Sequence, residues 1–159
     1  MIRVGVDKSG LEIKLRGLEQ GLRDLAPVWP KVHEILLAFM KQHFASEGTY
    51  AGVRWRVLSP NYARWKAKHY PGKKILQLRG DLYGSLTKPR HASHVFRSGP
   101  SFMEFGTSDW KARIHQTGSL KIANRPPRRI VLPKLTKAEG EQIVDVMLAF
   151  MLRKVRTGR

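Results

Sequence analysis

Hydrophobic residues recur at helical spacing in two long segments of the chain. The first segment begins after Pro30, and its broad apolar stripe consists of Val32, Ile35, Leu36, Phe39, Met40 and Phe44. This stripe predicts the main amphipathic helix, which we expect to end near Glu47 and Gly48. In the second segment, Thr136 and Glu139 have the spacing of a capping box. The apolar face behind them, which predicts a second long helix, consists of Ile143, Val146, Met147, Phe150 and Met151.

A different pattern, the alternation of apolar and polar residues, marks the start of the chain. Residues 2–6 and 11–15 alternate on either side of residues 7–10, and Gly10 suits a hairpin loop there. A short strand pair is therefore predicted. Leucines then repeat at helical spacing from Leu15 to Leu25, until Pro27 ends the repeat.

Two shorter helical segments are predicted in the middle of the chain. Ser59 and Pro60 form a typical helix start, with serine at the N-cap and proline at the first position. This helix should end at about residue 69 or 70, before Pro71. Residues 81–86 should form a short helical turn after Gly80.

The next part of the chain favours strands and loops. Residues 92–97 and 101–107 have the pattern of short strands, and residues 98–100 form the turn between them. Residues 119–129 are basic, contain proline and show no apolar period, which indicates a loop. Residues 130–132 predict a brief strand.

These elements predict one α+β domain over residues 1–152, with a basic C-terminal tail at 153–159. We expect a small, mostly antiparallel sheet packed with a long N-terminal helix and a C-terminal helix. The chain has 159 residues, of which 42% are hydrophobic, enough to bury a core without disulfides. It has no cysteine, which excludes thiol catalysis. It also lacks an apolar run of membrane-spanning length and a signal-peptide pattern, so we expect a soluble protein that is cytoplasmic at synthesis.

Positive charge is the most unusual property of the composition. The chain has 30 Lys and Arg against 12 Asp and Glu, a formal net charge of +18 at pH 7. The excess is concentrated in residues 73–129 and in the tail, whereas residues 130–152 are nearly neutral. Such a charge makes copies repel one another and attracts polyanions or acidic proteins.

No arrangement of residues predicts catalysis or a metal site. His91 and His94 are the one close histidine pair, but the nearest acidic residues lie ten positions away. Glu104, Asp109 and His115 have the composition of a catalytic triad without a specified nucleophile. The glycines match neither dinucleotide-binding nor P-loop spacing. We therefore expect no enzyme activity, no metal and no cofactor.

Nucleic-acid binding is the alternative function. The basic residues within 73–129 and the C-terminal tail could contact phosphates. Tyr62 and Trp65 are interleaved with lysines and arginines, as in a base-stacking surface. Their spacing of three on a short helix instead favours burial in the core. The chain has no helix-turn-helix, zinc-finger or RNA-recognition signature.

Four blocks, taken in order, resemble the phage virion morphogenesis proteins, the tail completion family of tailed phages and phage-derived particles. The first two blocks are Gly52–Trp55 with Leu58–Tyr62 and Lys66, and Ile75–Leu82 with Ser85 and Leu86. The other two are Phe105–Thr107 leading to Ala112–Gly118, and Pro126–Arg128 with Val131. The resemblance covers residues 12–152. It departs from the family pattern at Lys111, where the family usually has tyrosine, and at Pro127 and Arg129.

The resemblance implies a structural role in the virion. Such proteins act at the head-proximal end of the tail, or neck, where they complete the tail or join it to the head. It further implies a homo-oligomeric ring, with six copies suggested by the family, and contacts with other tail or neck proteins. A ring of copies that each carry +18 also needs counter-charged neighbours, either acidic proteins or packaged DNA.

The motif blocks supply the candidate interface residues. These residues are Trp55, Tyr62, Gly80, Leu82, His115, Gln116, Gly118, Arg128 and Arg129. In the family motif, His115 and Gln116 fit a buried polar pair that orders a turn ending at Gly118. Arg128 could bond backbone carbonyls or a neighbour's carboxylate. Ordinary turn chemistry and a solvated strand end are the open alternatives for these residues.

Overall fold

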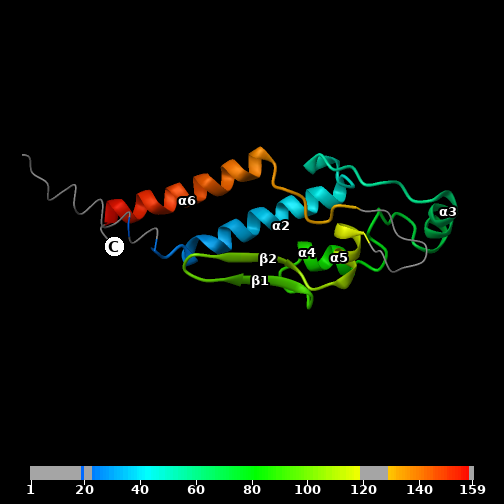
Figure 1. The fold of residues 1–159 in the computed structure, drawn as a ribbon, viewed down its shortest axis with the longest axis horizontal. Helices are drawn as coiled ribbons and strands as arrows, with labels where there is room; N and C mark the ends of the chain where they lie inside the picture. Colours follow the sequence, from blue (N-terminus) through cyan, green and yellow to red (C-terminus); the bar gives the residue numbers. More distant parts are fainter. Residues whose placement is uncertain (1–18, 20–22, 119–128, 158–159) are drawn as a thin grey trace, which may run out of the picture.

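The computed structural model describes residues 19, 23–118 and 129–157. The predicted hairpin at 2–15, most of the leucine repeat and the loop at 119–128, with Arg128, lie outside these residues. The described part is elongated (Figure 1). Helix α3 (Pro60–His69) lies at one end, and the C-terminal end of helix α6 (Lys137–Thr157) lies at the other.

Helix α2 (Trp29–Ala45) is the central element and confirms the predicted main helix. A short 3-10 helix (Ala26–Val28) precedes it, and Pro30 occupies its first turn, where a missing N–H has no cost. The predicted apolar stripe is buried apart from Ile35, which is partly exposed, and Phe44 is fully enclosed. The indole of Trp29 donates to the carbonyl of Gly99 at 2.7 Å, which fixes the start of the helix against the hairpin turn.

Helix α6 packs along α2 and is the longest helix described. The hydroxyl of Thr136 donates to the Glu139 carboxylate, so the two residues of the predicted capping box are in contact at the start of the helix. The phenol of Tyr50 also donates to Glu139, at 2.5 Å, from the 3-10 turn Thr49–Ala51 that follows α2. The helix continues to Thr157, so Arg153, Lys154 and Arg156 lie on its last turns.

The sheet is a two-stranded antiparallel hairpin, β1 (His94–Ser98) and β2 (Met103–Thr107). Its register pairs His94 with Thr107 and Ser98 with Met103, which confirms the predicted strands with slightly different bounds. Helix α4 (Asp81–Thr87) contacts both strands and α2. The sheet and α4 therefore lie on one side of α2, and α6 lies on the other (Figure 1).

Two apolar clusters meet along α2. The first surrounds Phe44, Leu86 and Val131, and the second joins Trp29 and Val32 to Phe150 of α6. Helices on a small antiparallel hairpin confirm the α+β class. Within the described residues, no helix is long and apolar enough to span a membrane.

The structure corrects two local expectations. Residues 130–132 form no strand, because side chains rather than a neighbouring strand satisfy their backbone. Where the sequence predicts a turn ending at Gly118, the chain forms helix α5 (Trp110–Thr117). The signals for this helix are present in the sequence: Asp109 caps its start by accepting from the Lys111 N–H, and Gly118, at φ 75°, ends it.

Candidate functional site

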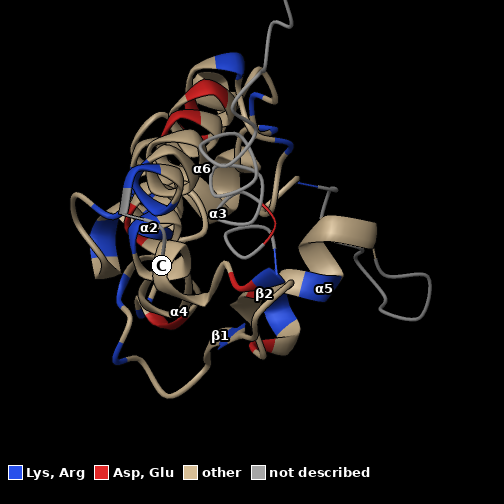
Figure 2. Cartoon of the chain, turned by 90° about the vertical axis from the view of Figure 1, so that its left-hand side faces the viewer, with Lys and Arg blue, Asp and Glu red and all other residues tan. Residues whose placement is uncertain are grey.

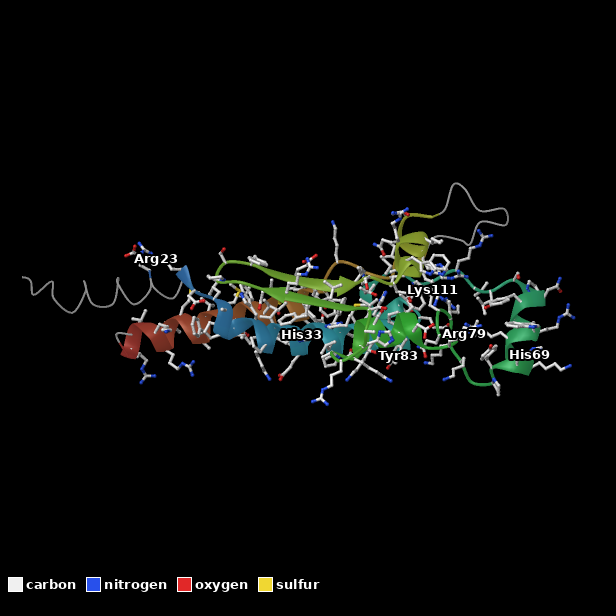
Figure 3. The ribbon with its side chains drawn as sticks, turned by 90° about the horizontal axis from the view of Figure 1, so that it is seen from below. Arg23, His33, His69, Arg79, Tyr83 and Lys111 are labelled. Atoms are coloured by element: carbon white, nitrogen blue, oxygen red, sulfur yellow. The ribbon has the colours of Figure 1, made fainter. Side chains whose placement is uncertain are left out.

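A groove of about 1020 Å³ opens between α3, the segment before α4, and α5. Five of the nine sequence-predicted residues line it, namely Tyr62, Gly80, Leu82, His115 and Arg129. The remaining lining residues are Leu58, Ser59, Lys66, Ile75, Leu76, Gln77, Leu78, Arg79, Asp81 and Lys111. In Figure 3, Arg79 and Lys111 lie between the body of the molecule and α3. The fold thus brings together residues that are up to 71 positions apart, from Leu58 to Arg129.

The groove has an apolar floor and a net positive charge. Leucine and isoleucine side chains come from residues 58, 75, 76, 78 and 82. Four cationic side chains line it, Lys66, Arg79, Lys111 and Arg129, against the single carboxylate of Asp81. The surrounding chain reinforces this sign, because residues 48–80 contain eight Lys and Arg and no Asp or Glu. Figure 2, viewed from the C-terminal end of α6, shows acidic positions on that helix and basic positions over the other elements.

Two of these cations are buried and brace the walls of the groove. Arg129 is 5% exposed, and its Nε donates to the Arg56 carbonyl at 3.0 Å while its Nη2 reaches the Val57 carbonyl at 3.5 Å. Lys66 is 4% exposed, and its Nζ donates to the Lys74 carbonyl at 2.5 Å. Burial lowers the pKa of both side chains. Arg129 therefore has the carbonyl-binding role that the sequence analysis offered for Arg128, which lies outside the described residues.

The other two cations are at the rim. Lys111 bridges the starts of two helices, since its Nζ lies 3.1 Å from Asp81 and 3.8 Å from Asp109. Arg79 is exposed and forms no ion pair with any described residue. The rim therefore offers at least one cation that is not engaged within the described chain.

Gln116 holds the segment that carries Arg129. Its Oε1 accepts from the N–H groups of Val131 and Leu132, at 2.8 and 3.0 Å, and its Nε2 donates to the Leu132 carbonyl at 3.0 Å. The His115 carbonyl accepts from the Arg129 N–H at 2.9 Å. The amide of Gln116 thus makes the hydrogen bonds to this backbone that a neighbouring strand would otherwise make. This explains why residues 130–132 look like a strand in sequence and yet pair with no strand in the described chain.

Trp55 and His43 also hold the segment that carries Arg129, through hydrogen bonds to the carbonyl of Ile130. The Trp55 indole is 3% exposed and donates to the Ile130 carbonyl at 2.8 Å. His43 is fully buried, and its Nε2 lies 2.9 Å from the same carbonyl, which can only accept, so Nε2 carries the hydrogen. Trp55 therefore lies behind the groove and shapes it rather than lining it.

The exposure of the α3 aromatics contradicts the sequence-based expectation. Tyr62 and Trp65 are 41% and 42% exposed, and their stacked rings lie 5.5 Å apart. Trp65 also stacks on His69 at 4.9 Å. Burial was expected from their spacing, but Lys66 is the residue of α3 that is buried, and α3 stands away from the main body (Figures 1 and 3). Spacing identifies a helix face, but it does not show whether another element covers that face.

The histidines and carboxylates form no metal site in the described residues. No group of three or more potential ligands is present there. His94 donates from Nδ1 to the Ser85 carbonyl at 2.7 Å, and its Nε2 lies 2.9 Å from His33 Nε2. Glu104, Asp109 and His115 do not assemble as a triad, because Glu104 pairs with Arg97 and Asp109 caps α5.

Acidification should destabilise the fold through one buried and two partly buried histidines. Burial lowers the pKa of His43, and burial also lowers the pKa of His115 and His33. As pH falls below about 6.5, the unfolded chain binds protons before the native one does, so the free energy of unfolding decreases. Each such site contributes at most about 1.4 kcal/mol per pH unit. His43→Gln, which retains a donor for Ile130, should flatten this slope in urea unfolding measured as a function of pH.

The control for this measurement is His69→Gln, which removes one exposed histidine of α3. A slope that is the same in wild type and His43→Gln would contradict the assignment of His43 as a neutral buried group.

Residues 6–151 match the phage virion morphogenesis family, which confirms the resemblance found in the four motif blocks. No curated protein and no solved structure matches the chain significantly.

Proposed function

Because the chain belongs to the phage virion morphogenesis family, we propose that it completes the head-proximal end of a phage tail, or joins the tail to the head, as a homo-oligomeric ring. Membership in the family assigns it a structural role in virion assembly. The finer position, in the tail or neck, and the contacts with other tail or neck proteins are parts of the proposal.

One observation carries the proposal: the motif residues converge on an open groove whose polar groups hold polypeptide. Arg129 and Lys66, which line the groove, bond backbone carbonyls of the chain itself, and Gln116, which is not among the lining residues, bonds the segment that carries Arg129. These bonds therefore hold α3 and the segments that contain Arg56 and Lys74 in place around an apolar surface, as an assembly protein requires. A binding surface of this kind suits a non-enzymatic virion component.

The experiment that tests this proposal is the production of particles without the protein. We expect electron microscopy to show tails separated from filled heads, or tails of abnormal length, together with loss of infectivity. Supplying the protein separately should restore complete particles. Normal tails attached to heads in its absence would show that the protein has no role in tail completion or joining.

A further inference from the structure

Helix α6 has a second apolar face, on the side away from the core. Its inner face packs on α2 through residues such as Ile143 and Phe150. Its outer face carries Val144, Leu148 and Leu152, which are 52%, 46% and 61% exposed. These three residues are four positions apart, so they form one stripe over successive turns.

Acidic residues flank this outer stripe. Glu141 and Asp145 lie one turn apart on α6, and both are exposed. Asp145 forms no ion pair with any described residue, whereas Glu141 lies 3.6 Å from Lys137. The segment 139–152 contains three acidic residues and no basic one. Because Glu139 is buried, the exposed acidic residues of this segment are Glu141 and Asp145. The outer face of α6 is thus both apolar and negative over residues 141–152, ahead of the basic last turns of the helix, in a chain whose net charge is +18.

The groove beside α3 has the complementary properties. It combines an apolar floor with four cations and one carboxylate. Its volume of about 1020 Å³ is at or above the upper end of small-molecule pockets, so it can accept several side chains of a protein segment. The groove lies toward the α3 end of the elongated molecule, whereas the outer stripe of α6 extends toward the opposite end (Figures 1 and 3).

We propose that the groove of one copy binds the outer face of α6 from the next copy, so that the subunits of the ring are joined head to tail. This inference rests on the oligomer of the proposed function and names the surfaces that form it. Two different patches on one subunit make a heterologous contact, which generates a ring when its rotation closes.

A second copy is favoured as the occupant because the chain itself carries both halves of the contact. Val144, Leu148 and Leu152 match the leucines of the groove floor, and Asp145 matches Arg79 at the rim, which forms no ion pair within the described part of the chain. The contact also places acidic groups of one copy on a basic part of its neighbour. It thereby offsets part of the repulsion between copies with the same net charge.

Two variants with opposite defects test the contact. Leu78→Glu combined with Arg79→Glu disables the groove, and Val144→Arg combined with Leu148→Arg disables the outer face of α6. The α6 residues and Arg79 are exposed and Leu78 is partly exposed, so the subunit fold should persist, as checked by circular dichroism and thermal unfolding. Lys41→Glu is the control, because it reverses one charge on an exposed position of α2 outside both surfaces.

Mass photometry and light scattering of the purified chain give the readout. The wild type and Lys41→Glu should form oligomers larger than a dimer, and each double variant alone should be monomeric, with association weakened at least ten-fold. An equal mixture of the two double variants should form a one-to-one dimer and nothing larger, because one intact groove meets one intact α6. This product distinguishes a head-to-tail contact from a symmetric one.

Three results would overturn the inference: a monomeric wild type, oligomers of wild-type size from either double variant, or a mixture that remains monomeric. The result of this oligomer measurement can be distinguished from the result of producing particles without the protein. Head-to-tail oligomers of a protein that is dispensable for tails would overturn the proposed function alone. Defective particles combined with a mixture that stays monomeric would overturn this contact alone.

Discussion

Replacing Trp55 with alanine should lower the free energy of unfolding by about 3–5 kcal/mol. The indole is 3% exposed and meets the rings of Phe44 and His43 edge to face, with centroids 5.2 and 5.1 Å away. Alanine would leave a cavity beside Phe44, at the centre of the first apolar cluster, and would remove the donor to the Ile130 carbonyl. Urea unfolding followed by circular dichroism measures the loss.

Trp55→Phe separates packing from hydrogen bonding. It keeps an aromatic ring against Phe44, and the Ile130 carbonyl still accepts from His43. The loss should therefore be smaller, at about 1–2 kcal/mol. If alanine and phenylalanine were equally destabilising, the hydrogen bond rather than the packing would carry the contribution of Trp55.

Replacing Gly48 with alanine should lower the free energy of unfolding by about 2–5 kcal/mol, through backbone strain and a clash. Gly48 has φ 91°, a conformation that side chains disfavour. A Cβ there would lie 2.3 Å from the Val53 carbonyl oxygen and 2.8 Å from Cδ1 of Trp55. Since neither the backbone carbonyl nor the buried indole can move freely, the loop behind the groove has to shift. Thermal or urea unfolding measures the effect.

Gly80→Ala is the matched control, because the two glycines share a conformation and differ in surroundings. Gly80 has φ 96°, but no atom lies within 4 Å of a Cβ built there. Its replacement should cost only the backbone strain, about 1–2 kcal/mol. A loss at Gly48 no greater than the loss at Gly80 would contradict the close approach of Val53 and Trp55.

Local patterns predicted most of the secondary structure correctly. The apolar stripe of α2, the serine–proline start of α3 and the capping pair of α6 each act within one or two turns, so the sequence displays them directly. The elements that were missed depend on distant partners. Residues 130–132 have the composition of a strand, but the side chain of Gln116 satisfies two of their N–H groups, and no local pattern shows this.

The candidate site was predicted only in part, and the reason is again distance along the chain. The motif blocks identified Tyr62, Gly80, Leu82 and His115, but not that they line one groove. Arg129 was noted as an additional charge, and its role as a buried brace depends on carbonyls more than 70 positions away. Likewise, the sequence does not show which apolar face of α6 is left exposed, because this depends on the packing of the other face against α2.

The sequence alone determined the α+β class, the two long helices, the family and the excess of positive charge, because these follow from composition and from patterns within a few residues. The tertiary structure decided which apolar residues are covered. It left the aromatics of α3 and the outer stripe of α6 exposed, and it buried Lys66 and Arg129. Burial depends on elements that meet from distant parts of the chain, and for that reason periodicity alone does not specify it.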